Sequence, residues 1–222
     1  MNLALFDLDH TLIPTDSDHE WGRFLIRRGV VDEAEYQRKN DQFYADYKAG
    51  TLDIHAFLRF ALAPLAAHPR DTLAQWHAEF MHDVILPKIT PQAKALVDQH
   101  LDAGDLCCVV TATNSFVTRP IAHALRIDEL IATELERDNA GRVTGRIRGV
   151  PALREGKITR VQAWLNARGQ RLEDFAEITF YSDSTNDLPL LELASRPVAT
   201  NPGPALEAIA RDRGWPVLKL FE

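Results

Sequence analysis

The sequence opens with Leu3-Ala4-Leu5-Phe6, and this apolar run is followed at once by Asp7-Leu8-Asp9. Apolar residues without polar alternation are typical of a strand buried on both faces of a parallel sheet. Such sheets bind ligands beyond the carboxyl ends of their strands, which is where the two carboxylates stand. We therefore expect a central strand at residues 3–6 that presents Asp7 and Asp9 to a functional site.

The segment from about Asp18 to Ile85 has a different pattern, because its apolar residues recur at helical spacing. One stripe consists of Trp21, Phe24 and Leu25, and another of Phe57, Leu58, Ala61 and Leu62. Gly50 and Pro64 punctuate the segment. The pattern predicts several helices without a strand, inserted directly after the first strand.

From Pro87 onward the chain alternates between strand and helix patterns. Helices are expected at residues 91–101, 114–125, 158–167, 189–194 and 204–211, with a break or fresh start at Pro120. Strands are expected at residues 106–110, 130–135, 178–181, 197–199 and 216–218. Asp138-Asn139-Ala140-Gly141 favours a turn inside a small hairpin. This alternation indicates an α/β fold with a parallel sheet.

Composition excludes several classes of partner. The chain has 222 residues, of which 45% are hydrophobic, and a net charge of -7. An acidic surface disfavours nucleic acid, and no apolar run approaches the ~20 residues of a membrane span. Cys107 and Cys108 lie in an apolar run and are expected to be small buried hydrophobic residues. Without a signal-peptide pattern, we expect a soluble cytoplasmic protein with neither nucleic-acid nor membrane partners.

Acidic and hydroxyl residues stand at the ends of three predicted strands. Asp7 and Asp9 follow the first, Thr111 the second, and Asp183 and Asp187 a later one. Because these ends meet at one edge of a parallel sheet, the carboxylates should converge there. Closely spaced carboxylates repel unless a cation lies between them, and Mg²⁺ prefers such hard oxygen ligands. The sequence therefore predicts a magnesium site.

This set of residues is suited to phosphoryl transfer. A carboxylate such as Asp7 can attack phosphorus once the phosphate charge is neutralised. Thr111 offers a hydroxyl, and we expect the N–H groups after it to open a helix and bind an anion. Lys157, expected just before a helix, offers a full positive charge. Asp9 could protonate the leaving alcohol and later activate water.

The motifs resemble those of one family when they are taken together. Asp7-Leu8-Asp9-His10-Thr11, Val109-Val110-Thr111, Lys157 and Asp183-Ser184-Thr185-Asn186-Asp187 are similar to the four ordered motifs of haloacid dehalogenase superfamily phosphatases. The inserted helices resemble the cap of subfamily IB, the phosphoserine phosphatase-like branch. The resemblance implies a Rossmann-like core at residues 1–15 and 87–222 and an all-helical cap at residues 16–86.

The resemblance also implies roles for individual residues. Asp7 would be the nucleophile that forms an aspartyl-phosphate, and Asp9 the general acid and base. Magnesium would be bound by Asp7, Asp183 and the carbonyl of Asp9. Thr111 and Ala112 would hold the phosphate together with Lys157, and the ligands would be supported by Thr11, Asn186 and Asp187.

The chain departs from phosphoserine phosphatases at the positions that read the substrate. The cap glutamate that holds the substrate amine corresponds to Asp16, but the arginine that holds its carboxylate corresponds to Ala61, with Arg59 two residues away. We therefore expect an amino-alcohol phosphate such as histidinol phosphate, with phosphoserine as the alternative. A different explanation of the acidic segment 15–20 is a helix capped by Ser17 or Asp18.

Two other classes of protein remain as alternatives. A receiver-type signalling domain also uses magnesium, acidic residues, a hydroxyl and a lysine at strand ends. It would, however, carry its phosphorylated Asp after a middle strand, where this chain has Thr111. The second alternative is a binding protein built on an inactive phosphatase fold, which the complete set of motifs disfavours.

Overall fold

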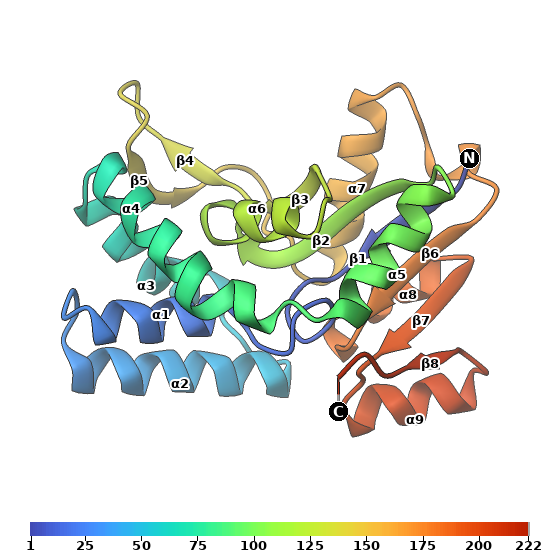
Figure 1. The fold of residues 1–222 in the computed structure, drawn as a ribbon, viewed down its shortest axis with the longest axis horizontal. Helices are drawn as coiled ribbons and strands as arrows, with labels where there is room; N and C mark the ends of the chain where they lie inside the picture. Colours follow the sequence, from blue (N-terminus) through green and yellow to red (C-terminus); the bar gives the residue numbers. More distant parts are fainter. Residues whose placement is uncertain (222) are drawn as a thin grey trace.

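A computed structural model describes residues 1–221, which form a six-stranded parallel sheet with helices on both faces (Figure 1). In spatial order the strands are β3 (Glu129–Thr133), β2 (Leu106–Asn114), β1 (Leu3–Phe6), β6 (Ile178–Ser182), β7 (Arg196–Thr200) and β8 (Val217–Leu218). Apart from the separate hairpin of β4 (Leu135–Arg137) and β5 (Val143–Ile147), this is the doubly wound strand order, in which the chain reverses direction across the sheet beside β1. The expected α/β core is confirmed.

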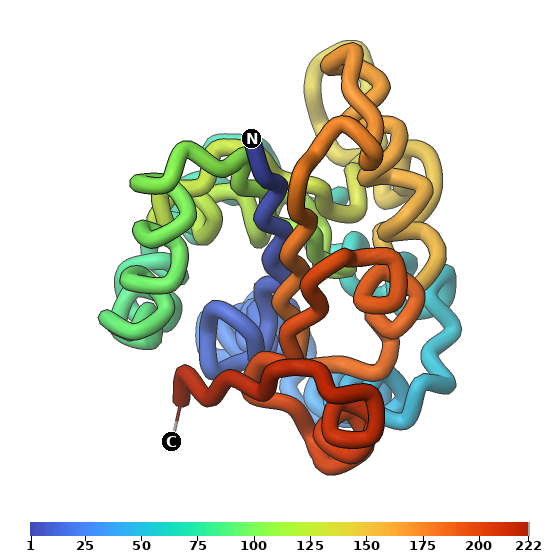
Figure 2. The backbone as a smooth tube through the Cα atoms, turned by 90° about the vertical axis from the view of Figure 1, so that its right-hand side faces the viewer, coloured from blue at the N-terminus to red at the C-terminus, as the bar shows by residue number. Residues whose placement is uncertain are grey.

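The register of β1 explains why Asp7 lies at the centre of the molecule. Leu3 pairs with Leu106 on one side and with Ile178 on the other, so β1 lies between β2 and β6. Figure 2 shows this arrangement as the blue N-terminal tube beside the orange β6. The Asp7 N–H still donates to the carbonyl of Tyr181 at 2.9 Å, so Asp7 emerges at the point where the strand order reverses.

Side chains of the central strands alternate between two hydrophobic layers, as strand geometry requires. Phe6 and Val109 pack on one face, against α5 (Pro91–Asp102) and α6 (Ser115–Ala124). Leu5 and Val110 pack on the other, against α7 (Glu155–Ala167), α8 (Leu188–Leu193) and α9 (Pro204–Asp212). The two cysteines are buried and free, and they belong to opposite layers, as expected for neighbours on one strand.

The segment between β1 and β2 is helical, as its sequence predicts. It contains α1 (Ser17–Arg27), α2 (Glu33–Ala49), α3 (Ile54–Ala67) and α4 (Arg70–Phe80), followed by a π-helical turn (Met81–Ile85) and a 3-10 turn (Leu86–Lys88) that lead into α5. Aspartates cap α1, α2 and α3, and the left-handed Gly50 ends α2. Trp21, Leu62 and Phe80 extend the hydrophobic layer of α5 and α6.

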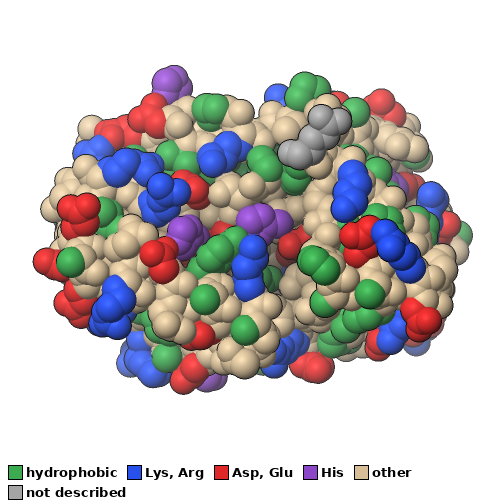
Figure 3. Space-filling view, turned by 90° about the horizontal axis from the view of Figure 1, so that it is seen from below, with side chains coloured by type: hydrophobic (Ala, Val, Ile, Leu, Met, Phe, Trp, Pro, Cys, Tyr) green, Lys and Arg blue, Asp and Glu red, His purple; other side chains and the backbone are tan. Residues whose placement is uncertain are grey.

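The remaining elements are short. The expected hairpin is present as antiparallel strands β4 (Leu135–Arg137) and β5 (Val143–Ile147), and it packs against α3. Single 3-10 turns occur at Leu172–Asp174 and Thr185–Asp187. Within residues 1–221 no helix is both long and apolar enough to cross a bilayer. On the face in Figure 3, acidic and basic side chains are interspersed and form no continuous basic surface.

Five expectations about where elements begin, end or break were wrong. β2 continues to Asn114, so Thr111 lies inside the strand, and the helix that follows opens only at Ser115. α6 runs through Pro120, and α3 through Pro64. A proline removes one backbone donor and crowds the carbonyl four residues earlier, and burial of the apolar helix face offsets that cost.

The other two errors concern residues of the candidate site. α7 begins at Glu155, which puts Lys157 in its first turn and not before the helix. The N-cap of α1 is Asp16, whose carboxylate accepts from the N–H of His19, and neither Ser17 nor Asp18 takes that position. Boundaries of this kind depend on which side chain reaches the free N–H groups, which spacing in the sequence does not determine.

Candidate active site

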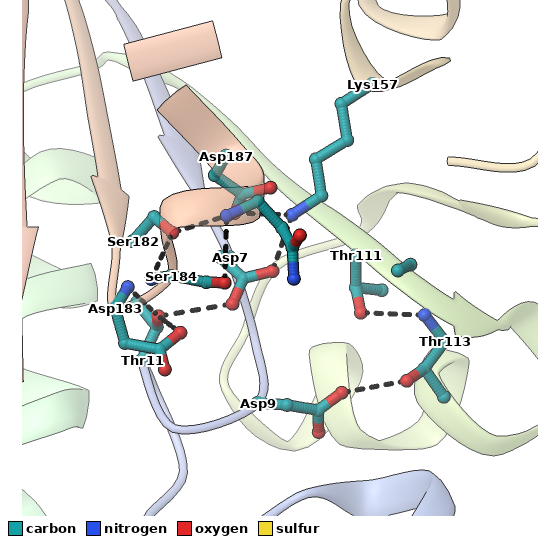
Figure 4. Close-up of polar contacts among 12 residues, drawn as sticks. Asp7, Asp9, Thr11, Thr111, Thr113, Lys157, Ser182, Asp183, Ser184 and Asp187 are labelled. Carbon is teal, nitrogen blue, oxygen red and sulfur yellow. Dashed lines mark hydrogen bonds and ion pairs between the residues drawn. The ribbon is translucent and has the colours of Figure 1, made fainter. Parts of the chain in front are cut away.

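The chain turns sharply after β1 and holds two carboxylates on one side. The N–H groups of Thr11, Leu12 and Ile13 all point to the carbonyl of Leu8, which closes a tight loop. His10 adopts a left-handed conformation with φ of 57°, and its carbonyl accepts from the amide of Asn201 at 3.0 Å. Figure 4 shows Asp7 and Asp9 projecting from this loop toward the ends of β2 and β6.

Lys157 is the buried cation of the site. Its Nζ lies 2.7 Å from Asp7 Oδ1 and 2.7 Å from Asp187 Oδ2, and the side chain is 1% exposed (Figure 4). Burial alone would lower the pKa of Lys157, but the carboxylates of Asp187 and Asp7 raise it above its ordinary value. The lysine is therefore a fixed positive charge beside Asp7.

Asp187 fixes the position of Lys157 through the second of the two buried ion pairs. Its Oδ2 also accepts from the hydroxyl of Ser182 at 2.7 Å, which ties the 3-10 turn to the end of β6. Its Oδ1 is buried and has no hydrogen-bond partner within residues 1–221. An acceptor left in this way costs free energy unless a water or a cation reaches it.

Asp7 and Asp183 converge on one hydroxyl. Thr11 Oγ1 lies 3.2 Å from Asp7 Oδ2 and 3.3 Å from Asp183 Oδ1, and it also accepts from the Asp183 N–H at 3.1 Å. Burial raises the pKa of Asp7 to about 7 although Lys157 opposes the shift. Burial, followed by the charge of Asp7, raises the pKa of Asp183 well above its ordinary value. The single hydroxyl proton of Thr11 can be donated to only one of the two carboxylates at a time and removes the charge of neither.

This arrangement fits a magnesium ion. Two carboxylates near one another and short of positive charge are what Mg²⁺ binds, with waters and substrate phosphate completing its octahedron. In the part of the chain that the structure describes, no group of three or more His, Cys, Asp or Glu side chains has the geometry of a metal site.

Asp9 is held at both carboxylate oxygens. Oδ1 accepts from the N–H of Ser17 at 2.7 Å, and Oδ2 accepts from the hydroxyl of Thr113 at 2.8 Å. Burial, reinforced by the charge of Asp16, raises the pKa of Asp9 to about 6. A carboxyl group that gains and loses a proton near neutral pH is suited to general acid and base catalysis.

The end of β2 contributes Thr111, Ala112 and Thr113. Its pairing with β3 shifts in register between Val110 and Asn114, and inside this irregularity the Thr113 N–H donates to Thr111 Oγ1 at 3.2 Å. Since α6 opens only at Ser115, the expectation that the N–H groups after Thr111 begin a helix was wrong. Any N–H groups that meet a phosphate beside Thr111 belong to the irregular strand end.

A cavity opens between these residues and the inserted helices. Its floor contains Asp7, Asp9, Thr111 and Ala112. Its walls are aromatic on the side of α2 and α3, from Phe43, Tyr44, Tyr47 and Phe57, and acidic at the start of α1, from Asp16 and Asp18. No lysine or arginine of residues 1–221 lines it.

The inserted helices are joined to the core above this cavity. The Asn186 amide donates to the carbonyl of Tyr47 at 3.0 Å, and the Arg154 guanidinium donates to the carbonyl of Gly50. The hydroxyl of Tyr44 lies 2.9 Å from His10 Nε2. Asn186 therefore connects the loop of Asp183 and Asp187 to α2.

One predicted substrate contact lies elsewhere. Arg59 is exposed on α3 and lines a separate groove with Tyr36 and Lys39, whereas Asp16 lines the cavity. Sequence reasoning also missed several residues of the site. Thr113 could have been found from its position two residues beyond Thr111 on a strand, and Tyr44 and Tyr47 from their helical spacing. Nothing in the sequence singles out Arg154.

Comparisons with known proteins agree with this geometry. Residues 4–192 match the haloacid dehalogenase-like hydrolases. The "Histidinol-phosphatase" of Neisseria meningitidis serogroup C is 52% identical over 217 residues, which cover 98% of both chains. The "Phosphoserine phosphatase SerB1" of Mycobacterium tuberculosis H37Rv is 32% identical, over 96% of this chain and 69% of that protein.

Two solved structures have the same fold. A Bordetella pertussis Tohama I protein described as of unknown function superposes with a TM-score of 0.94 at 55% identity, over 99% of both chains. A substrate-bound phosphoserine phosphatase superposes with a TM-score of 0.68 at 20% identity, over 98% of this chain and 92% of the other. At that identity the likeness is one of fold alone.

Proposed function

The chain belongs to the haloacid dehalogenase-like hydrolases and is a phosphatase of the aspartyl-phosphate type, and we propose that it hydrolyses histidinol phosphate with Asp7 as the nucleophile. The observation that carries the choice of substrate is the charge of the cavity. Asp16 and Asp18 line the same cavity as Asp7, and no arginine or lysine of the described residues lines it. A substrate cation is stabilised there, whereas a substrate carboxylate is not.

The proposed reaction has two displacements on phosphorus. Asp7 attacks the phosphate, an oxygen–phosphorus bond forms, and the ester bond to the alcohol breaks as Asp9 donates its proton to the leaving oxygen. Asp9, now ionised, removes a proton from water. That water attacks the aspartyl-phosphate, the bond to Asp7 breaks, and inorganic phosphate leaves.

Other side chains of the site stabilise the charge of the transferring group. Lys157 supplies a fixed positive charge 2.7 Å from Asp7, and Thr111 and Ala112 lie on the cavity floor beside it. Magnesium would be held by Asp7, Asp183 and the Asp9 carbonyl, and when bound it supplies the positive charge that phosphoryl transfer needs. Thr11 bonds to both Asp7 and Asp183, Asp187 holds the Lys157 that contacts Asp7, and Asn186 ties the loop of Asp183 to α2.

We propose that the two parts of the chain have the roles that the family resemblance implies. Residues 1–15 and 87–222 form the catalytic core, and residues 16–86 form a cap that supplies the substrate-reading wall. The proposal is supported by the lining of the cavity, since the phosphate end belongs to the core and the aromatic and acidic walls belong to α1, α2 and α3.

Phosphoserine is the second candidate, because a relative with that name is 32% identical. Its carboxylate would enter a wall that already carries Asp16 and Asp18. The position that could compensate is occupied by the buried Ala61, and Arg59 lies on the separate groove. The geometry therefore favours an amine without a carboxylate. A receiver domain and an inactive binding protein are both disfavoured by the family match and the intact set of groups around Asp7.

The test compares kcat/KM for histidinol phosphate, phosphoserine and an uncharged aryl phosphate. We expect histidinol phosphate to exceed phosphoserine by at least about tenfold, since the phosphoserine carboxylate finds no partner. Asp16→Asn keeps an N-cap for α1 but removes the charge, so it should lower kcat/KM for histidinol phosphate by about 10- to 100-fold and spare the aryl phosphate.

Asp32→Asn is the matched control, because Asp32 caps α2 in the same way but is exposed and does not line the cavity. If Asp16→Asn lowered kcat/KM for the aryl phosphate as much as for histidinol phosphate, Asp16 would support the fold and would not bind the amine. Faster hydrolysis of phosphoserine than of histidinol phosphate would overturn the proposed substrate.

A further inference from the structure

Asp18 is an acidic residue of the cavity wall that the reaction does not use. It lies in the first turn of α1, and its Oδ1 accepts from Asn114 Nδ2 at 3.3 Å. The orientation of that amide is settled, because Asn114 Oδ1 accepts from the N–H groups of Phe116 and Val117 as the N-cap of α6. The fixed amide holds Asp18 against the cavity.

Asp16 and Asp18, the two carboxylates of the cavity wall, differ in the hydrogen bonds that they accept. Asp16 caps α1, and its Oδ1 accepts from the His19 N–H at 2.8 Å. Asp18 receives only the long bond from Asn114, and no hydrogen bond from residues 1–221 reaches its Oδ2. Burial, followed by the charges of Asp16 and Asp9, raises the pKa of Asp18 well above its ordinary value. A bound donor or cation would relieve this deficit.

The surroundings of the two carboxylates place them in order along the cavity. Asp16, the N-cap of α1, lies next to the Ser17 N–H that binds Asp9. Asp18 lies two residues further along α1 and accepts from Asn114, which follows Thr113 at the end of β2. Asp16 is thus nearer the phosphate end, and Asp18 lies further from it along α1.

We propose that Asp18 is a specificity-determining residue that accepts a hydrogen bond from a ring N–H at the end of the substrate remote from the phosphate. The inference rests on the proposed function. In histidinol phosphate the ammonium lies one carbon from the phosphorylated carbon, and the imidazole lies beyond it. Asp16 therefore takes the ammonium and Asp18 the imidazole N–H. The aromatic side chains of Tyr47 and Phe57 on the same cavity offer faces for the ring.

The test uses two substrates that share the phosphate and the ammonium. Histidinol phosphate has the ring, and O-phosphoethanolamine does not. Asp18→Asn and Asp18→Ala should lower kcat/KM for histidinol phosphate by about 10- to 100-fold and leave phosphoethanolamine within about twofold. Asp16→Asn should lower kcat/KM for both, because both carry the ammonium. Asp32→Asn, remote from the cavity, should change neither.

A second measurement separates recognition from a structural role. Removing a carboxylate that accepts one long hydrogen bond and has no donor at Oδ2 within residues 1–221 should leave the melting temperature of the free protein unchanged or raise it. A lower melting temperature together with equal losses on both substrates would overturn the assignment. So would unchanged activity of both Asp18 variants on histidinol phosphate while the wild type still prefers that substrate. A wild type that does not hydrolyse histidinol phosphate would instead reject the proposed function itself, and with it this inference.

Discussion

Lys157 Nζ lies 2.7 Å from Asp187 Oδ2, and both side chains are 1% exposed although 30 residues separate them in the chain. The pair also holds Lys157 against Asp7, so the position of the positive charge depends on a carboxylate that does not face the cavity. A buried ion pair of this kind is intolerant of losing one member, because the other is left as an uncompensated charge.

Lys157→Met should therefore abolish turnover and lower the free energy of unfolding by about 3–5 kcal/mol, the usual cost of breaking a buried pair. Urea denaturation followed by circular dichroism measures the second effect. Lys94→Met is the matched control, since Lys94 is exposed on α5 and should change stability only slightly. Stability of Lys157→Met equal to that of the control would contradict the importance of the pair.

Asp7→Asn should reduce phosphate release to background while the fold survives, because an amide cannot replace the attacking carboxylate. The amide still accepts from Lys157, so the surrounding contacts persist. Initial rates and the circular dichroism spectrum check the two halves of this prediction. Activity within about tenfold of wild type would remove Asp7 from the nucleophile position.

Asp9→Asn should slow turnover by roughly 10²- to 10⁴-fold, the usual contribution of a general acid and base. Thr113→Val removes the 2.8 Å hydrogen bond that orients Asp9 and should cost about tenfold. Steady-state rates on an aryl phosphate report both effects. An unaltered rate in Asp9→Asn would assign proton transfer to another group, with His10 the next candidate in the loop.

Chelation should stop the reaction, magnesium should restore it, and calcium should not. Calcium prefers more ligands and longer bonds, which would displace a carboxylate that must both bind the ion and attack phosphorus. Asp183→Asn should raise the magnesium concentration needed for half-maximal activity, because one of the two converging carboxylates loses its charge. Full activity in excess chelator would contradict the role of the metal.

His77 should make stability fall on acidification. It is buried, its Nε2 lies 3.0 Å from the Val117 carbonyl, and burial lowers its pKa below the ordinary value of 6.5. The unfolded state then binds protons more readily than the folded state, so stability is fully present above about pH 6.5 and is lost as the pH falls through the folded pKa. His77→Gln should show a shallower loss between about pH 7 and pH 5 in urea titrations. Equal slopes in the two proteins would exclude His77 as a source of the loss.

Local sequence was sufficient to predict an element where its residue types permit only one structure. The strand at Leu3–Phe6 was predicted to the residue, because four apolar side chains in a row can only be satisfied by burial on both faces. The hairpin around Gly141 and the strand-free insertion followed equally from turn chemistry and helical spacing. Where capping or a proline decided a boundary, the prediction was wrong, as at Pro120 and Lys157.

The sequence by itself determined the α/β class, the family and the carboxylates at the strand ends, because these depend on residue type and on order along the chain. Only the tertiary structure decided what surrounds them. Asp7 and Lys157 are 150 residues apart, and Thr113 reaches Asp9 across 104 residues, so neither contact is encoded in local spacing. For the same reason Arg59, expected to contact the substrate, lines a separate groove, whereas Asp18, expected at most to cap a helix, lines the cavity. The rotation of α1 and α3 about their axes, set by packing of their apolar faces, directs Asp18 into the cavity and Arg59 to the outer groove.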